Sequence, residues 1–354
     1  MLVCVFYFYG FLVFLFFIVI IVYIFCAVFF VYLTVFRCFV FNMTIQGLWN
    51  YVNSHGLAVE RRLSDPEFAG FTVVIDGHAW LHAAAVSSAY RLLLGVEDYA
   101  YVETFMRRLR ALRAAGNHLS PVVVFDGAVP AEKVACVGIH RSALRRSAEA
   151  DFHAAHAAGD FKLARRAACA AVRITDQMVA SVLAAANADG FFAFRAPFEA
   201  DASLANLGSS PNTVVVAEDS DLIAHGVHIL AAKLQFPSLL CSLVRPFEVR
   251  SAARIPSLPA FRMLCVVAGC DYLPSPPRVA FTVALALVHS RASHYVSEVC
   301  VASDVDALAV FPRFVEVFAS IVPRPPGSDY VALATIAHSA FCIQCYRAFA
   351  PCCR

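Results

Sequence analysis

Three short apolar runs in this chain are each followed at once by acidic residues. The runs are Phe71–Ile75, Val122–Phe125 and Thr213–Ala217. Short unbroken apolar runs are typical of strands that are buried on both faces of a parallel sheet. Between the runs lie long stretches of good helix formers: Tyr99–Ala115, Ala143–Ala171 and Asp176–Ala186. The alternation predicts an α/β fold with a mostly parallel central sheet flanked by helices.

The first 42 residues follow a different pattern. They contain one charged residue, Arg37, and 12 of the 31 Phe of the chain. The stretch is long enough to cross a bilayer, since a span needs about 20 apolar residues. It lacks the basic start and the cleavage site of a secretory signal. Two interpretations remain: a membrane anchor, or a start-site artefact with the true start at Met43. We favour the artefact, because thymine-rich noncoding DNA read in frame gives this mixture of residues.

Composition narrows the function classes only slightly. The 354 residues are 60% hydrophobic and 15% charged, with a net charge of +2. This abundance of apolar residues excludes a disordered chain, and 13 Cys spread over this length do not indicate a disulfide scaffold. The near-neutral charge gives no global signal for nucleic acid, so a function must be argued from local motifs.

Seven carboxylates recur beside the apolar runs or at predicted helix ends. They are Asp76, Asp126, Glu199, Asp201, Asp219, Asp221 and Asp271. Because ligand sites form beyond the carboxyl ends of parallel strands, we expect these side chains to converge. Asp219 and Asp221 are two apart just past a strand, and on an extended segment both would face one ion. Glu199 and Asp201 open a helix, with Pro197 near its start.

Converging carboxylates repel one another unless cations hold them together. Donor sets made only of oxygen select Mg²⁺ or Mn²⁺. Two such ions roughly 4 Å apart can activate a water and stabilise the leaving oxygen of a phosphodiester. The residues alone therefore predict a two-metal enzyme of phosphoryl transfer or hydrolysis.

Six segments occur in the order typical of a known family. They are Met43–Trp49, Val74–His82, Val123–Gly127, Ala196–Ala202, Glu218–Leu222 and Gly269–Pro274. The sequence resembles the XPG/flap-endonuclease superfamily of structure-specific 5′ nucleases, and within it the exonuclease 1 branch. The resemblance runs from Met43 to about Asp271. It implies a PIN-like nuclease fold with a helical arch and a C-terminal helical region, and a chain that begins near Met43 with its first residues close to the site.

The resemblance also implies roles for individual residues. One Mg²⁺ would be bound by Asp76, Asp126, Glu199 and Asp201. A second would be bound by Asp219, Asp221 and Asp271, and Asp201 could be shared between the two ions. Mn²⁺ could substitute for Mg²⁺. Lys133, Arg141, Arg145 and Arg146 would lie in the arch and bind DNA, with Lys133 at the scissile phosphate. His82 and Trp80 are interpreted as packing or substrate-adjacent residues. No small-molecule cofactor is expected.

The implied reaction is 5′→3′ hydrolysis of DNA and cleavage of 5′ flaps in repair or replication. The expected partner is DNA with 5′ ends, nicks, gaps or flaps, bound by a monomer in the nucleus, with the mitochondrion as the alternative. The expected regions are an apolar segment (1–42), an N-terminal nuclease region (43–150), arch and connecting helices (151–187), an internal nuclease region (188–285) and a C-terminal helical region (286–354).

The sequence departs from the family pattern at several positions. Thr44 replaces a glycine, Glu132 replaces a second lysine, and Pro274–Ala280 contains no glycine where the family binds duplex backbone through main-chain amides. Two other hypotheses therefore remain: a flap endonuclease acting mainly at branch points, and a catalytically weakened DNA-binding paralogue. The presence of all seven acids favours an active enzyme.

Overall fold

The computed structural model describes residues 45–129, 138–291, 293–294, 304–321, 334–335 and 337–339. The chain divides into two compact units, 1–42 and 43–354, and the described residues all belong to the second. The predictions for residues 1–42 and for Lys133 lie outside the described residues.

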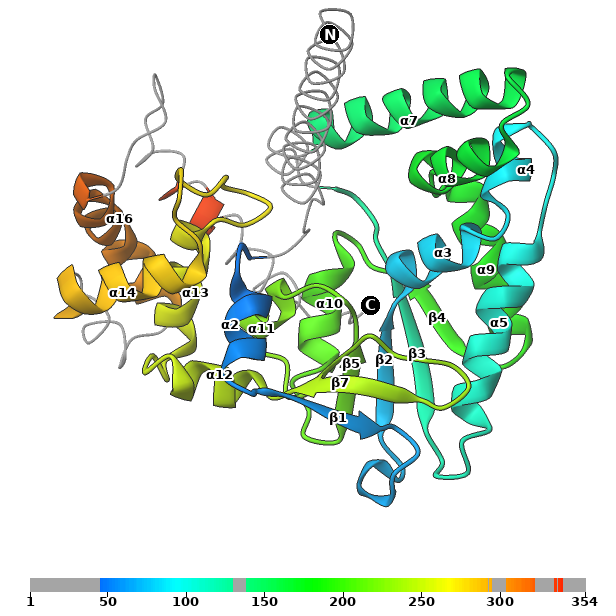
Figure 1. The fold of residues 1–354 in the computed structure, drawn as a ribbon. Coiled ribbons are helices and arrows are strands. Elements are labelled where there is room, and N and C mark those ends of the chain that lie inside the picture. The colour runs from blue at the N-terminus through cyan, green and yellow to red at the C-terminus, as the bar shows by residue number, and fades with distance from the viewer. Residues whose placement is uncertain are drawn as a thin grey trace, which may run out of the picture. The chain divides into compact units, whose positions relative to one another are not determined.

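A seven-stranded sheet forms the centre, in the order β1-β7-β6-β5-β2-β3-β4 (Figure 1). The strands are β1 (Ala58–Arg62), β2 (Thr72–Asp76), β3 (Ser120–Phe125), β4 (Phe192–Arg195), β5 (Thr213–Val216), β6 (Leu230–Ala232) and β7 (Leu240–Val244). The five strands from β6 to β4 are parallel to one another, and β7 pairs antiparallel with both β6 and β1. The predicted mostly parallel sheet is confirmed.

The described residues also form helices, some of which cover the two faces of the sheet. They are α2 (Leu48–Ser54), α3 (Gly77–Ala85), α4 (Ala89–Leu93), α5 (Ala100–Arg113), α7 (Ile139–Ala157), α8 (Phe161–Ala171), α9 (Asp176–Ala188), α10 (Ala200–Leu207), α11 (Asp221–His225), α12 (Pro246–Ala252), α13 (Leu258–Ala268), α14 (Phe281–Arg291) and α16 (Asp304–Ile321), with a 3₁₀ turn η1 (Pro66–Phe68). Figure 1 shows α10 and α13 on one side of the sheet and α5 and α9 on the other.

The core is divided by the sheet, because successive strand residues point to opposite faces. In β2, Val74 packs into the cluster under α10, α11 and α13, while Val73 and Ile75 pack into the cluster under α3, α5 and α9. All three side chains are fully buried. Burial on both faces explains why these strands appear as unbroken apolar runs in the sequence.

The helical stretch predicted over Ala143–Ala171 is two helices. The chain leaves α7 at Ala158, turns through Gly159 at φ +74°, and begins α8 after Asp160. The Asp160 carboxylate accepts a hydrogen bond from the Leu163 N–H at 2.9 Å, which caps the new helix. Gly159, in the left-handed region, ends the first helix, and Asp160 caps the second. The break forms despite the high helix propensity of the flanking alanines. Helix α7 runs through the expected region boundary at residues 150–151, and α14 through that at 285–286.

Strand β4 lies at the edge of the sheet, and one side chain occupies its outer hydrogen-bonding groups. Asn187 Nδ2 donates to the Ala193 carbonyl at 3.3 Å, and the Ala193 N–H donates to Asn187 Oδ1 at 3.4 Å. On the same strand Phe192 is 63% exposed.

No single helix among the described residues is long and apolar enough to cross a membrane. Helices α8 and α9 would satisfy that test together, by length and composition only, with a bend of 79° between them.

Candidate active site

The predicted acids gather where parallel strands end. Asp76 is the last residue of β2, and Asp126 directly follows its neighbour β3. Asp219 and Asp221 follow β5, on the other side of β2. These acids therefore lie at or just after the carboxyl ends of neighbouring parallel strands, at the positions along the chain that the sequence indicated.

Asp76 joins β2 to α3. Its carboxylate accepts a hydrogen bond from the Ala79 N–H at 3.1 Å and so caps the helix. The helix starts directly against the ring of Phe125, because a Cβ on Gly77 would lie 2.8 Å from that ring. The glycine after Asp76 therefore serves packing, and it sets the direction in which α3 leaves the sheet edge.

A close backbone approach brings Asp126 to the start of α10. The Asp126 carboxylate accepts a hydrogen bond from the Ala200 N–H at 2.7 Å. The Gly127 N–H donates to the Phe198 carbonyl at 2.6 Å, and a Cβ on Gly127 would lie 2.0 Å from the Ala196 carbonyl oxygen. Only glycine permits this approach, which holds Asp126 beside the helix that carries Asp201 in its first turn.

We expect Gly127→Ala to separate the two segments and lower the free energy of unfolding by about 2 kcal/mol or more. Urea unfolding would measure the loss. Gly70→Ala is the matched control: Gly70 has φ +75° but nothing lies within 4 Å of its added Cβ, so only backbone strain of about 1 kcal/mol is expected there. Equal losses in the two variants would contradict the close-approach argument.

Tyr272, the residue after Asp271, contacts Glu199. Glu199 precedes α10, is 6% exposed, and its carboxylate accepts a short hydrogen bond from the Tyr272 hydroxyl. Asp271 follows α13 and is 3% exposed. The helix ends at Gly269, as the sequence predicted, with φ +108°. The second half of the site thus depends on the turn after α13.

The prediction for Asp219 and Asp221 is wrong in its local geometry. The segment is not extended, since Asp221 is the first residue of α11. Asp219 turns the chain because its carboxylate accepts the Asp221 N–H at 2.9 Å. The Asp221 carboxylate in turn accepts the Ile45 N–H at 3.0 Å. The predicted proximity of the first family segment to the site is confirmed by this contact.

Four of the acids influence one another electrostatically. The pKa of Asp219 is raised well above its ordinary value, first by burial and then by the negative charges of Asp221, Asp201 and, more weakly, Asp271. Raised pKa values of this kind are typical of functional carboxylate clusters.

The chemistry of this donor set fits a hard divalent cation, because the set is all oxygen and mutually repulsive. Among the described residues, no three acidic, His or Cys side chains already surround one point closely enough to hold an ion. The donor chemistry therefore fits a metal, while the side chains are not gathered into a finished coordination shell.

One predicted DNA-binding cation instead contacts an acid of the site. Arg141 of α7 approaches both Asp271 carboxylate oxygens through a single guanidinium nitrogen, at 3.1 and 3.3 Å. The side chains are 19% and 4% exposed. Arg141 Nε is buried without a hydrogen-bond partner in the described part of the chain. The pair supplies positive charge to the site, in a geometry that leaves the guanidinium only partly satisfied.

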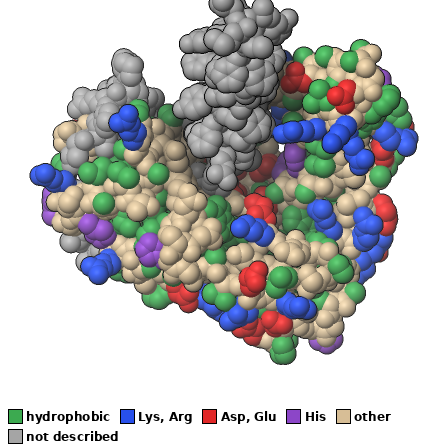
Figure 2. Space-filling view, viewed as in Figure 1, with side chains coloured by type: hydrophobic (Ala, Val, Ile, Leu, Met, Phe, Trp, Pro, Cys, Tyr) green, Lys and Arg blue, Asp and Glu red, His purple; other side chains and the backbone are tan. Residues whose placement is uncertain are grey.

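Among the other predicted cations of the arch, the two that the structure describes are exposed. Arg145 and Arg146 lie on the solvent side of α7, and Arg165 and Arg166 on that of α8. Figure 2 shows Lys and Arg side chains side by side over the α7–α8 hairpin. Exposed cations in a row are suited to contact a polyanion.

His78 belongs to the site and was missed by the sequence interpretation. Its Nδ1 lies 2.9 Å from the Asp126 backbone nitrogen and 3.2 Å from the Asp126 carboxylate. Burial lowers the pKa of His78, and the charge of Asp126 opposes this only in part. Its position two residues after Asp76, in the first turn of α3, was the available signal.

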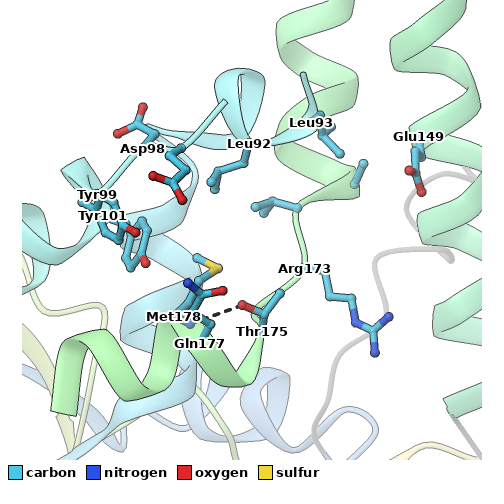
Figure 3. Close-up of a pocket in the computed structure, with 13 residues that line it drawn as sticks. Leu92, Leu93, Asp98, Tyr99, Tyr101, Glu149, Arg173, Thr175, Gln177 and Met178 are labelled. Carbon is cyan, nitrogen blue, oxygen red and sulfur yellow. Dashed lines mark hydrogen bonds between the residues drawn. The ribbon is translucent and has the colours of Figure 1, made fainter. Parts of the chain in front are cut away.

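A pocket of about 310 Å³ lies apart from these acids, between the α4–α5 loop, α7 and the α8–α9 connection (Figure 3). Its lining includes Asp98, Tyr101, Glu149, Arg173 and Thr175. None of the seven predicted site residues lines it, so it is separate from the candidate active site.

Comparison with known proteins explains the order of the motifs. The family model for the XPG N-terminal domain matches residues 43–148. Exonuclease 1 of Xenopus laevis is 30% identical over 236 residues, which is 66% of this chain and 31% of that protein. Exodeoxyribonuclease 1 of Saccharomyces cerevisiae is 30% identical over 254 residues, 70% of this chain and 35% of that protein. The chain belongs to the XPG/flap-endonuclease superfamily.

Within that superfamily, the similarity to exonuclease 1 proteins confirms the predicted branch. The chain spans about a third of the length of these relatives. Among solved structures, the catalytic core of Rad2 in complex with a DNA substrate matches with a TM-score of 0.54 at 14% identity, over 84% of each chain. This likeness confirms the predicted 5′ nuclease fold.

Proposed function

We propose that this chain is a metal-dependent 5′ nuclease that hydrolyses DNA phosphodiesters in the 5′→3′ direction and cleaves 5′ flaps. The observation that carries the proposal is the cluster around Asp219, where burial and neighbouring carboxylates raise one pKa strongly. Such a cluster requires cationic ligands when it is ionised. The superfamily membership and the DNA-bound state of the Rad2 core support DNA as the substrate.

In this proposal the acids hold two divalent ions, Mg²⁺ or Mn²⁺. One ion is held by Asp76, Asp126, Glu199 and Asp201. The other ion is held by Asp219, Asp221 and Asp271, and Asp201 lies between the two ions. When bound, such ions lower the pKa of water and stabilise the leaving oxygen. The chain's own residues position these ligands: Gly127 keeps Asp126 at α10, and Tyr272 orients Glu199.

The cations of the arch would bind the phosphate backbone. Lys133, Arg145 and Arg146 are the proposed contacts, together with Arg141 once it leaves Asp271. We further propose that the protein acts in DNA repair or replication. It would act as a monomer in the nucleus or, alternatively, in the mitochondrion. Imaging of a C-terminally tagged chain would test the location.

The decisive experiment is a cleavage assay with the full chain, Mg²⁺, and 5′-labelled DNA duplexes with a recessed 5′ end or a 5′ flap. Wild type should cut both, and the Asp219→Ala variant neither. Glu248→Ala is the matched control, because Glu248 is an exposed carboxylate on α12 outside the site. Failure of wild type to cut any DNA while it still binds the duplex would favour the weakened paralogue, and cutting of flaps alone would favour the branch-point endonuclease.

The turn between α13 and α14 predicts weak processivity. This turn contains Pro274–Ala280, which has no glycine to let phosphates approach the main chain closely. We expect the enzyme to release duplex after few cleavages. With unlabelled trap DNA added after the start of the reaction, the labelled strands should stop shortening after few further cleavages. Continued degradation of the same labelled molecules would contradict the prediction.

A further inference from the structure

His78 contacts the main chain at the point where Asp126 leaves β3. The imidazole stands edge-on to Phe125, with ring centroids 5.6 Å apart and planes at 74°. The Asp126 N–H donates to His78 Nδ1 at 2.9 Å. The side chain of His78 is 31% exposed. The ring therefore lies at the rim of the acid cluster, with one nitrogen bound to the backbone.

That contact defines the tautomer of the ring. A nitrogen that accepts an N–H donor carries no proton, so a neutral ring has its proton on Nε2. Nδ1 also lies 3.2 Å from an Asp126 carboxylate oxygen, but a ring nitrogen cannot accept from the amide and donate to the carboxylate in the same protonation state. The contact at 2.9 Å is the shorter of the two and has the geometry of a hydrogen bond.

Asp126 is consequently fixed at two of its polar groups. Its N–H is bound by His78, and its Oδ1 accepts the Ala200 N–H at 2.7 Å. The next residue, Gly127, is bound to the chain before α10. These contacts leave Oδ2 as the Asp126 carboxylate oxygen that makes no hydrogen bond with the main chain. The hydrogen bonds of the Asp126 N–H and of Oδ1 set the direction in which Oδ2 points.

We propose that His78 is a positioning residue, whose Nδ1 fixes the backbone of Asp126 so that the carboxylate is presented to a divalent cation. The inference rests on the proposed function and deepens it, because it names a residue outside the acid set that would control metal affinity. Groups that orient a metal ligand typically change affinity by about 10- to 100-fold when removed.

Three substitutions distinguish this role from simple packing. Asn places an amide oxygen near the position of Nδ1 and can accept the Asp126 N–H. Gln places its polar atoms near the position of Nε2 instead, and Phe fills the space without an acceptor. His228→Phe is the control, because His228 is an exposed histidine outside the site.

The experiment titrates the full chain without DNA with Mn²⁺ and measures the rise in Tm and the dissociation constant by calorimetry. We expect His78→Phe and His78→Gln to weaken Mn²⁺ binding about 10-fold, while His78→Asn and His228→Phe stay within about 3-fold of wild type. The Mg²⁺ concentration for half-maximal cleavage should shift in parallel, with the KM for DNA unchanged.

Each result decides one of the two proposals. Wild type that neither binds Mn²⁺ nor cuts DNA would overturn the proposed function. Wild type that binds Mn²⁺ together with unchanged binding by His78→Phe would overturn the role of His78. Should the Phe variant fail to fold, the comparison of Asn with Gln remains, and a Gln variant that binds as well as or better than the Asn variant would contradict the Nδ1 contact.

Discussion

Asp219→Asn is expected to abolish DNA cleavage and, in the absence of divalent ions, to stabilise the fold by on the order of 1–3 kcal/mol. Asp219 is half-buried, and both this burial and the neighbouring carboxylates raise its pKa. An ionised Asp219 therefore costs free energy in the metal-free protein, and a neutral amide of the same shape does not. Stabilisation by loss of a functional group is typical of strained active sites.

The sign of the pH dependence follows from the same shift. The pKa of Asp219 is higher in the folded than in the unfolded chain, so the folded state binds the proton more tightly. The contribution of Asp219 to stability falls as pH rises from its unfolded pKa of about 3.9 through its raised folded value. Above that range the penalty is constant.

Urea unfolding of wild type and Asp219→Asn in the presence of chelator, at several pH values, would measure the effect. The stabilisation by Asn should be small at the acid end and largest above the folded pKa. Addition of Mg²⁺ should reverse the order of stability, because a bound cation favours the ionised form of wild type. An Asn variant less stable than wild type in chelator would contradict the electrostatic account.

Arg141→Ala is expected to destabilise the metal-free protein by roughly 2–4 kcal/mol, because it removes the guanidinium that contacts the buried Asp271 carboxylate. The pair is 3.1 Å apart and the Asp271 side chain is 4% exposed. Arg141 itself is about one fifth exposed, which places the expected loss below that of a fully buried pair.

A double-mutant cycle isolates this interaction. Arg141→Ala alone should be destabilising, whereas the double variant with Asp271→Asn should recover most of the loss, since the charge that Arg141 contacts is removed as well. If the loss is additive, Arg141 acts through packing alone. Under the proposed function, Mg²⁺ should also reduce the cost of Arg141→Ala, because a cation would then neutralise Asp271.

The sequence predicted the sheet well because its strands are buried on both faces. The side chains of Val73, Val74 and Ile75 are buried on one face of the sheet or the other, so the strand is an unbroken apolar run. The acid that follows the run marks the edge of the sheet where ligands bind. The position of Asp76 and Asp126 followed directly from that pattern.

The pattern of hydrophobic and polar residues did not predict the hydrogen bonds made by side chains. Asp219 bends its own segment by accepting the Asp221 N–H, and periodicity carries no information on such a local cap. The pairing of Arg141 with Asp271 joins residues 130 positions apart, and only the packing of α7 determines it. His78 Nδ1 accepts a hydrogen bond from a backbone amide, and no residue type in the sequence signals a contact with the main chain.

The amide of Asn187 has a consequence for how copies of this molecule meet. An open sheet edge next to an exposed aromatic ring is a template on which a second chain can add a strand. At Ala193 both outward groups are already engaged by Asn187, while Phe192 beside them remains 63% exposed. The Asn187 side chain thus occupies, at Ala193, the pair of main-chain groups that an added strand would use.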